Sequence, residues 1–146
     1  MLLRPANSMD AGAVGAILFE FIDTTAWMPR VHTRAEDLAH AARMIELGWV
    51  TVALQNEQIV GFTARDGAEL NALYISQSAR DHGVGAALLE HAKTGENALY
   101  LWTFQANSGA QRFYQRHGFS EVSRTDGAGN DEKLPDIQLV WHRKDI

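Results

Sequence analysis

Two closely spaced glycines follow a run of residues that is typical of a β-strand. The run ends in Leu73, Tyr74 and Ile75, and the loop after it contains Arg80-Asp81-His82-Gly83-Val84-Gly85-Ala86. The pattern beyond the glycines predicts a helix, and the first backbone N–H groups of a helix have no partners within it. Those groups converge, so the segment predicts a cradle for an anion such as a phosphate, with Arg80 as a further donor.

A Gly-x-Gly pair alone is weak evidence for such a cradle, because an ordinary turn before a helix has the same composition. A Rossmann dinucleotide site is excluded, since Leu88 occupies its third glycine position. The connection from Ser76 to His82 is also too long for the tight turn of that fold. The loop by itself therefore indicates a plain turn before a helix, and an anion site needs further evidence.

A second group of residues follows the next predicted strand. Asn107 stands at the end of that strand, and Tyr114 lies two turns into the helix after it. An amide and a phenol so placed can project toward the point where adjacent strand ends part, and open α/β sheets bind ligands at such strand ends. Taken alone, the segment favours a structural interpretation, with Asn107 as a helix cap and Tyr114 as a core aromatic on the same stripe as Ala110 and Phe113.

Together the two segments resemble the GNAT acyltransferase family. The resemblance rests on Arg-x-x-Gly-x-Gly after a Leu-Tyr-Ile strand and on Asn-x-x-Ala-x-x-Phe-Tyr-x-x-x-Gly-Phe after the next strand, and it is sharp from about Glu69 to Phe119. It implies an N-acetyltransferase that moves an acetyl group from acetyl-CoA, its co-substrate, directly to an amine of a small molecule, peptide or protein. A module that binds acetyl-CoA without catalysis is the alternative.

The resemblance also implies roles for individual residues. Main-chain groups of the Leu73–Ile75 strand would bond the pantetheine arm and the acetyl carbonyl, and the amides from Arg80 to Ala86 would hold the pyrophosphate. Asn107 would bond the pantetheine arm, and Tyr114 would lie near the thioester sulfur. A neutral amine would then attack the thioester carbonyl, a strand amide such as that of Ile75 would stabilise the oxyanion, and the phenol would protonate the departing thiolate.

Three parts of this assignment are specific to the present chain. Asp81 and His82 stand in the phosphate loop, where small or basic residues are more usual in the family. Glu69 is a candidate general base, beside Asp66 and Glu20. Acceptor specificity is expected from residues 27–33, with Trp27 and His32 as candidate contacts, and from the acidic stretch 126–136.

Hydrophobic periodicity predicts the elements that position these residues. Strand-like runs occupy 49–54, 59–65, 68–75, 99–104, 119–124 and 137–141, after a short edge strand at Leu2-Leu3. Helices are predicted after Ser8, after the capping box Thr33-to-Glu36, over 84–93 and over 108–117. The order indicates an α/β (mixed α+β) domain over residues 1–146, with a sheet of six or seven strands and helices on both faces. The resemblance adds a splayed parallel strand pair.

Composition restricts the function further. The net charge of -5 without a basic cluster disfavours a nucleic-acid binder, and the absence of cysteine excludes thiolate metal sites and cysteine nucleophiles. The histidines lack metal-ligand spacing, so no metal is expected. No run is apolar enough for a signal peptide or a membrane span, which predicts a cytoplasmic protein without a membrane partner. The oligomeric state stays open between a monomer and a homodimer.

Overall fold

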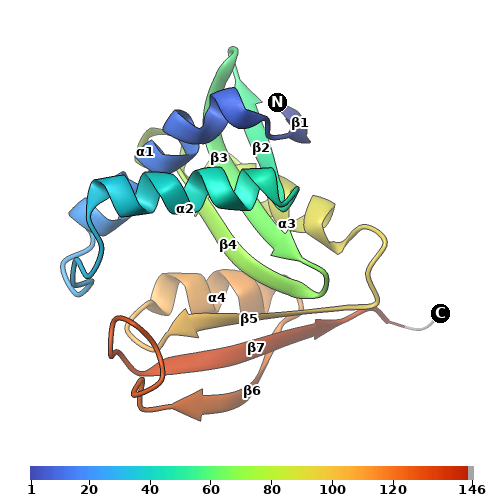
Figure 1. Ribbon diagram of the computed structural model, residues 1–146. Helices are drawn as coiled ribbons and strands as arrows, with labels where there is room; N and C mark the ends of the chain where they lie inside the picture. The colour runs from blue at the N-terminus through green and yellow to red at the C-terminus, as the bar shows by residue number, and fades with distance from the viewer. Residues whose placement is uncertain (145–146) are drawn as a thin grey trace.

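A single sheet runs through the computed structural model, which describes residues 1–144 (Figure 1). Within these residues the sheet has seven strands in the order β1-β2-β3-β4-β5-β7-β6. The strands are β1 (Leu2–Pro5), β2 (Val50–Gln55), β3 (Gln58–Asp66), β4 (Glu69–Ile75), β5 (Ala98–Phe104), β6 (Ser120–Thr125) and β7 (Asp136–His142). The helices are α1 (Ala11–Thr24), α2 (Arg34–Glu46), α3 (Val84–Lys93) and α4 (Ser108–Arg116). The predicted fold class is confirmed.

The parallel strand pair β4 and β5 is the feature that opens the sheet. These two strands pair at one position, between Glu69, the first residue of β4, and Tyr100, near the beginning of β5. Every other pair of neighbouring strands in the described residues is antiparallel and pairs over four or more positions. The two strands therefore separate toward Ile75 and Phe104, which confirms the predicted splay.

Helices cover the two faces of the sheet unequally. On one face α1 and α2 pack on β2, β3 and β4 through Val14, Met44 and the fully buried Phe62. On the other face α3 packs on β2, β3 and β4, where Leu88 is fully buried, and α4 packs with Leu89 of α3 on β5 and β7. Figure 1 shows α1 and α2 in front of the first half of the sheet, α3 behind that half, and α4 where β4 and β5 part.

Side-chain caps fix where the first two helices begin. Thr33 and Glu36 form the predicted capping box at the start of α2, with bonds of 3.1 and 2.9 Å. The cap predicted at Ser8 is wrong by one residue. Asn7 accepts the N–H of Met9 at 3.0 Å, and Asp10, held by Arg4 at 2.7 Å, accepts the N–H of Asn7 at 2.8 Å. A one-turn 3-10 helix (Ser8–Asp10) therefore precedes α1.

Gly61 on β3 lets α3 approach the sheet closely. It pairs with Ile75, and a Cβ there would lie 2.8 Å from the Ile75 Cδ1 and 3.2 Å from the Leu88 Cδ1 of α3. The same Cβ would lie 3.2 Å from the Tyr74 carbonyl oxygen, which belongs to the backbone and cannot swing aside. The absent side chain thus sets the distance between α3 and the end of β4.

We expect Gly61→Ala to lower the free energy of unfolding by about 1–3 kcal/mol, because the added methyl group overpacks this contact. Gly12→Ala is the matched control, since a Cβ at Gly12 in α1 meets nothing within 4 Å. The control should be neutral or slightly stabilising, as alanine favours helix more than glycine. Urea unfolding followed by circular dichroism measures both, and equal midpoints for Gly61→Ala and the parent protein would refute the close-packing argument.

Candidate active site

A cavity of about 880 Å³ opens where β4 and β5 part. Four segments line it: the end of β4, the loop into α3, one side of α4, and the stretch from Phe21 to Trp27 at the end of α1. Its lining contains nearly all the residues that were predicted to bind the cofactor, namely Leu73, Tyr74, Ile75, Arg80, Asp81, Gly83, Val84, Gly85, Ala86, Asn107 and Tyr114. His82 is exposed in the same loop and is not part of the lining.

The start of α3 has the geometry of an anion cradle. Gly83 caps the helix with φ 79°, a left-handed conformation that favours glycine. The Ala87 N–H donates to the Gly83 carbonyl at 3.1 Å, so the N–H groups of Val84, Gly85 and Ala86 precede the helical ladder. These groups and the exposed Arg80 fit a pyrophosphate.

Gly85 differs from Gly83 in having an ordinary helical conformation. A Cβ at Gly85 would lie 3.4 Å from the Phe113 ring of α4, an ordinary van der Waals contact, so an alanine fits there and only a larger side chain would press on α4. The role of Gly85 as a cofactor contact rests on its backbone N–H alone.

Main-chain N–H groups of β4 point into the gap beside β5. The Ser76 N–H donates to the Val60 carbonyl of β3 at 2.7 Å. Because successive N–H groups of a strand point to opposite sides, the N–H groups of Ile75 and Leu73 point away from β3. β5 has already separated there, so these donors face the cavity rather than a neighbouring strand.

Asn107 and Tyr114 combine the structural and functional roles that the sequence left open. The Asn107 Oδ1 caps α4 by accepting the Ala110 N–H at 3.1 Å. The Asn107 Nδ2 donates no hydrogen bond within residues 1–144, and Asn107 borders the cavity. The Tyr114 ring packs edge-on against Phe113 and Phe119, with ring centroids 5.3 and 5.4 Å away.

The phenol of Tyr114 remains protonated at neutral pH. Tyr114 is 8% exposed, and burial raises the pKa of its hydroxyl, with a smaller contribution from Tyr74. A phenol whose pKa is raised keeps its proton over the whole neutral range. Tyr114 can therefore donate a proton or a hydrogen bond to a group that becomes negative in the cavity.

A second cavity of about 490 Å³ lies on the α1 and α2 side of the sheet. It shares Phe21 and Tyr74 with the first cavity. A small space of about 90 Å³ between β4 and β5 is lined by Tyr74, Tyr114 and Phe104. The three spaces meet at Tyr74. Burial of the Tyr74 hydroxyl, with a smaller contribution from the nearby Glu132, raises its pKa to about 12.

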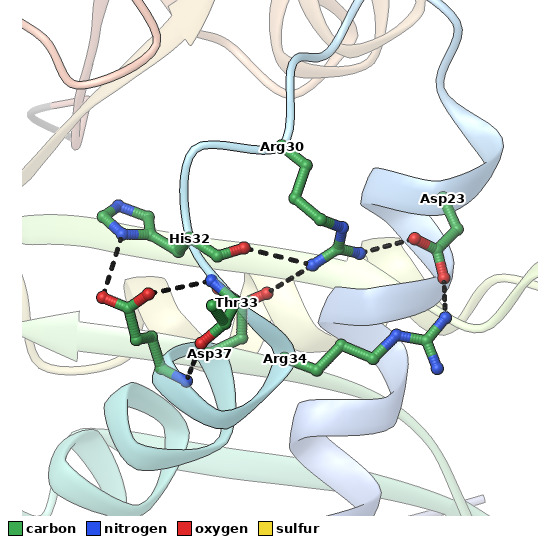
Figure 2. A network of polar contacts seen from close by, with 7 residues as sticks. Asp23, Arg30, His32, Thr33, Arg34 and Asp37 are labelled. Atoms are coloured by element: carbon green, nitrogen blue, oxygen red, sulfur yellow. Dashed lines mark hydrogen bonds and ion pairs between the residues drawn. The ribbon is translucent and has the colours of Figure 1, made fainter.

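Ion pairs at the rim of the second cavity compensate its basic residues (Figure 2). Arg30 contacts Asp23 at 2.5 Å and Asp37 at 3.3 Å. The hydrogen bond from Arg30 lowers the pKa of Asp23, with a further contribution from Arg34. His32 contacts Asp131, across the cavity in the loop before β7, at 3.3 Å. The rim also includes Glu36 and Glu132, so it carries more negative than positive charge when histidine is neutral.

The structure separates two candidates, Glu69 and Trp27, from the places expected for them. Glu69 lies at the opposite end of β4 from Ile75, accepts a hydrogen bond from the Tyr100 hydroxyl at 2.8 Å, and lines none of these cavities. Along an extended strand that separation is about 20 Å, so Glu69 lies far from the end of β4, where a base would take the proton of the attacking amine. Trp27 lines the first cavity instead of the acceptor side, whereas His32 lines the second.

Sequence reasoning did not single out Phe21 or Glu132. Phe21 lies on the apolar stripe of α1 and is indistinguishable there from a core residue. Glu132 belongs to the predicted acidic stretch, but only the packing of that loop against Tyr74 distinguishes it from its neighbours. No sequence pattern marks either residue as part of a site.

The splayed strands, the anion cradle and the buried phenol define an acyltransferase that uses an acyl-CoA. Comparison with known families agrees, since the model described as "Acetyltransferase (GNAT) domain" matches residues 46–121. Peptidyl-lysine N-acetyltransferase YjaB of Escherichia coli is 33% identical over 109 residues, which are 75% of this chain and 74% of that protein. The chain belongs to the GNAT acetyltransferase family, and its co-substrate is acetyl-CoA.

Other relatives support the same classification. YjaB of Salmonella typhimurium is 32% identical over 93 residues, a match that spans 64% of this chain and 63% of the relative. The solution structure of apo YjaB from Escherichia coli has a TM-score of 0.80 at 25% identity, covering 96% of both chains. YncA of Salmonella typhimurium, solved with acetyl-CoA, shares the fold with a TM-score of 0.74 at 19% identity, covering 100% of this chain and 95% of that one. Over residues 1–144, none of the helices is long and apolar enough to cross a bilayer.

We expect Arg80→Glu to weaken acetyl-CoA binding about 10- to 100-fold, because it replaces a charge-assisted donor with a carboxylate beside the pyrophosphate. Arg43→Glu is the matched control: Arg43 is an exposed arginine on α2 that lies outside the three cavities. Isothermal titration calorimetry measures the dissociation constant of each variant. Equal weakening by both reversals would show an effect of net charge alone and would contradict a local role for Arg80.

Proposed function

We propose that this protein transfers the acetyl group of acetyl-CoA directly to the side-chain amine of a lysine in a peptide or protein. The observation that carries the proposal is the second cavity, which meets the acetyl-CoA side at Tyr74 and combines an apolar wall with an acidic rim. The names of the YjaB relatives, peptidyl-lysine N-acetyltransferases, support the same acceptor class.

The cavity suits the two parts of a lysine side chain. Leu18, Ile22 and Met44 provide apolar surface for the four methylene groups. Asp131 and Glu132 provide negative charge for the ammonium group, and acidic walls raise the local concentration of a cation. A hydroxyl acceptor would gain nothing from these carboxylates.

In this proposal the residues around Tyr74 divide the chemical work. Acetyl-CoA supplies an activated acetyl group, and the Ile75 N–H is placed to donate to the acetyl oxygen as negative charge develops on it. Tyr114 donates its proton to the thiolate that leaves, and the proton that the nitrogen loses as the amide forms returns to the Tyr114 oxygen. An ammonium has no lone pair, so Glu132, acting through a water molecule, takes the proton that the amine must lose before it attacks.

We expect Tyr114→Phe to lower the turnover number by roughly 10²-fold, since the ring and its packing remain while the proton donor is lost. The dissociation constant for acetyl-CoA should stay the same, and this measurement is the internal control for an intact site.

Turnover of the parent protein should rise with pH to a plateau as the acceptor amine loses its proton. Steady-state release of CoA with a lysine peptide measures these quantities. A rate independent of pH, or a best acceptor that bears only a hydroxyl group, would contradict the amine mechanism.

A further inference from the structure

Strands β5, β7 and β6 expose one face of the sheet beside the second cavity, which is called the acceptor cavity below because it is proposed to bind the acceptor lysine. Leu99 and Leu101 of β5 are buried against α4, so Tyr100 and Trp102 point to the opposite face, because side chains alternate along a strand. Tyr100 pairs with Val140 of β7, and Trp102 pairs with Gln138. The same rows continue onto β6, where the small side chains of Ser120 and Ser123 stand. We call these six residues the open face: Tyr100, Trp102, Gln138, Val140, Ser120 and Ser123.

No helix of residues 1–144 covers the open face. Figure 1 shows α1 and α2 over β2, β3 and β4, and leaves β5, β7 and β6 bare on that side. Trp102 is 46% exposed, although a tryptophan on a sheet face normally packs under another element. Trp102 therefore offers a large aromatic surface that a segment bound beside the second cavity can cover.

The open face is continuous with the acceptor cavity. Trp102 and Phe104, next to each other on the same side of β5, both line the space between β4 and β5. Phe104 and Asn71 also line the acceptor cavity. A chain that places a lysine in the cavity therefore meets Trp102 as its next neighbour on the protein.

Negative charge predominates along this path, although Arg30 also borders the second cavity. Glu69 lies beside Tyr100 at one end, and Asp131 and Glu132 border the cavity at the other. The six residues of the open face include neither lysine nor arginine. This arrangement complements a segment that carries apolar and basic residues near its lysine.

We propose that the open face binds the residues that flank the acceptor lysine, so that the enzyme selects lysines within an extended, exposed segment of a polypeptide over free amines. The inference rests on the proposed lysine acceptor and adds the means of choosing among lysines. An extended chain advances about 3.3 Å per residue, so the distance from Phe104 to Tyr100 accommodates about four residues. Trp102 is the main anchor, since large aromatic side chains dominate such interfaces.

Two acceptors that carry the same amine test this inference. One is Nα-acetyl-lysine methylamide, and the other is a peptide with a central lysine and four apolar or basic residues on each side. Trp102→Ala should lower kcat/KM for the peptide about 10-fold, mainly through KM, and leave kcat/KM for the small amide unchanged. Leu38→Ala is the matched control, because Leu38 on α2 is 40% exposed and lies outside the open face. Thermal unfolding checks that both variants fold.

Each result of this experiment has a definite meaning. Equal effects of Trp102→Ala on the two acceptors, or equal losses from Trp102→Ala and Leu38→Ala, would overturn the docking role while the lysine acceptor stands. A parent protein that acetylates neither acceptor, yet acetylates another class of amine, would overturn the proposed function itself. A dimer that Trp102→Ala converts to a monomer in sedimentation velocity would show that a second copy covers the open face, and would also overturn the peptide role.

Discussion

The separation of β4 from β5 determines the rest of this structure. Once the pair Glu69 and Tyr100 is passed, the backbone donors on one side of β4 have no neighbouring strand to bond. Buried N–H groups without partners are costly, so a structure that maintains such a gap needs either water or a ligand in it. A ligand with carbonyl and amide groups, such as the pantetheine arm of acetyl-CoA, satisfies these donors.

The other parts of the site follow from that gap. α3 begins beside the end of β4, so its free N–H groups lie at one mouth of the gap, and Gly61 keeps the helix close enough for this. α4 begins at the end of β5 and turns Tyr114 back into the same space. The acidic rim stands at the opposite mouth. The two cavities therefore have free N–H groups on one side and an acidic rim on the other, and they meet at Tyr74.

Local sequence was enough to predict the elements around the glycine loop. α3 spans Val84–Lys93, as predicted, because glycines with left-handed φ values stand just before and just after it. The face on which each β4 side chain lies was beyond prediction. Side chains two residues apart on a regular strand lie on the same face of the sheet. A register shift in the pairing of β3 and β4 changes this, so that Leu70 packs with α3 and α4 while Ala72 packs with α1 and α2. For the same reason spacing could not tell whether Glu69 reaches the reaction centre, and the roles of Phe21 and Glu132 depend on tertiary contacts that no short motif encodes.

The central claim is that acetyl-CoA lies in the gap between β4 and β5, with Ile75 at its acetyl end and residues 80–86 at its pyrophosphate. The most direct test is a titration of ¹⁵N-labelled protein with acetyl-CoA, followed by the backbone amide resonances. This account predicts the largest changes at Leu73, Ile75 and the amides of Gly83 to Ala86, with the amide of Glu69 unmoved. Changes centred on other residues, with those of Ile75 and Gly85 unaltered, would contradict it.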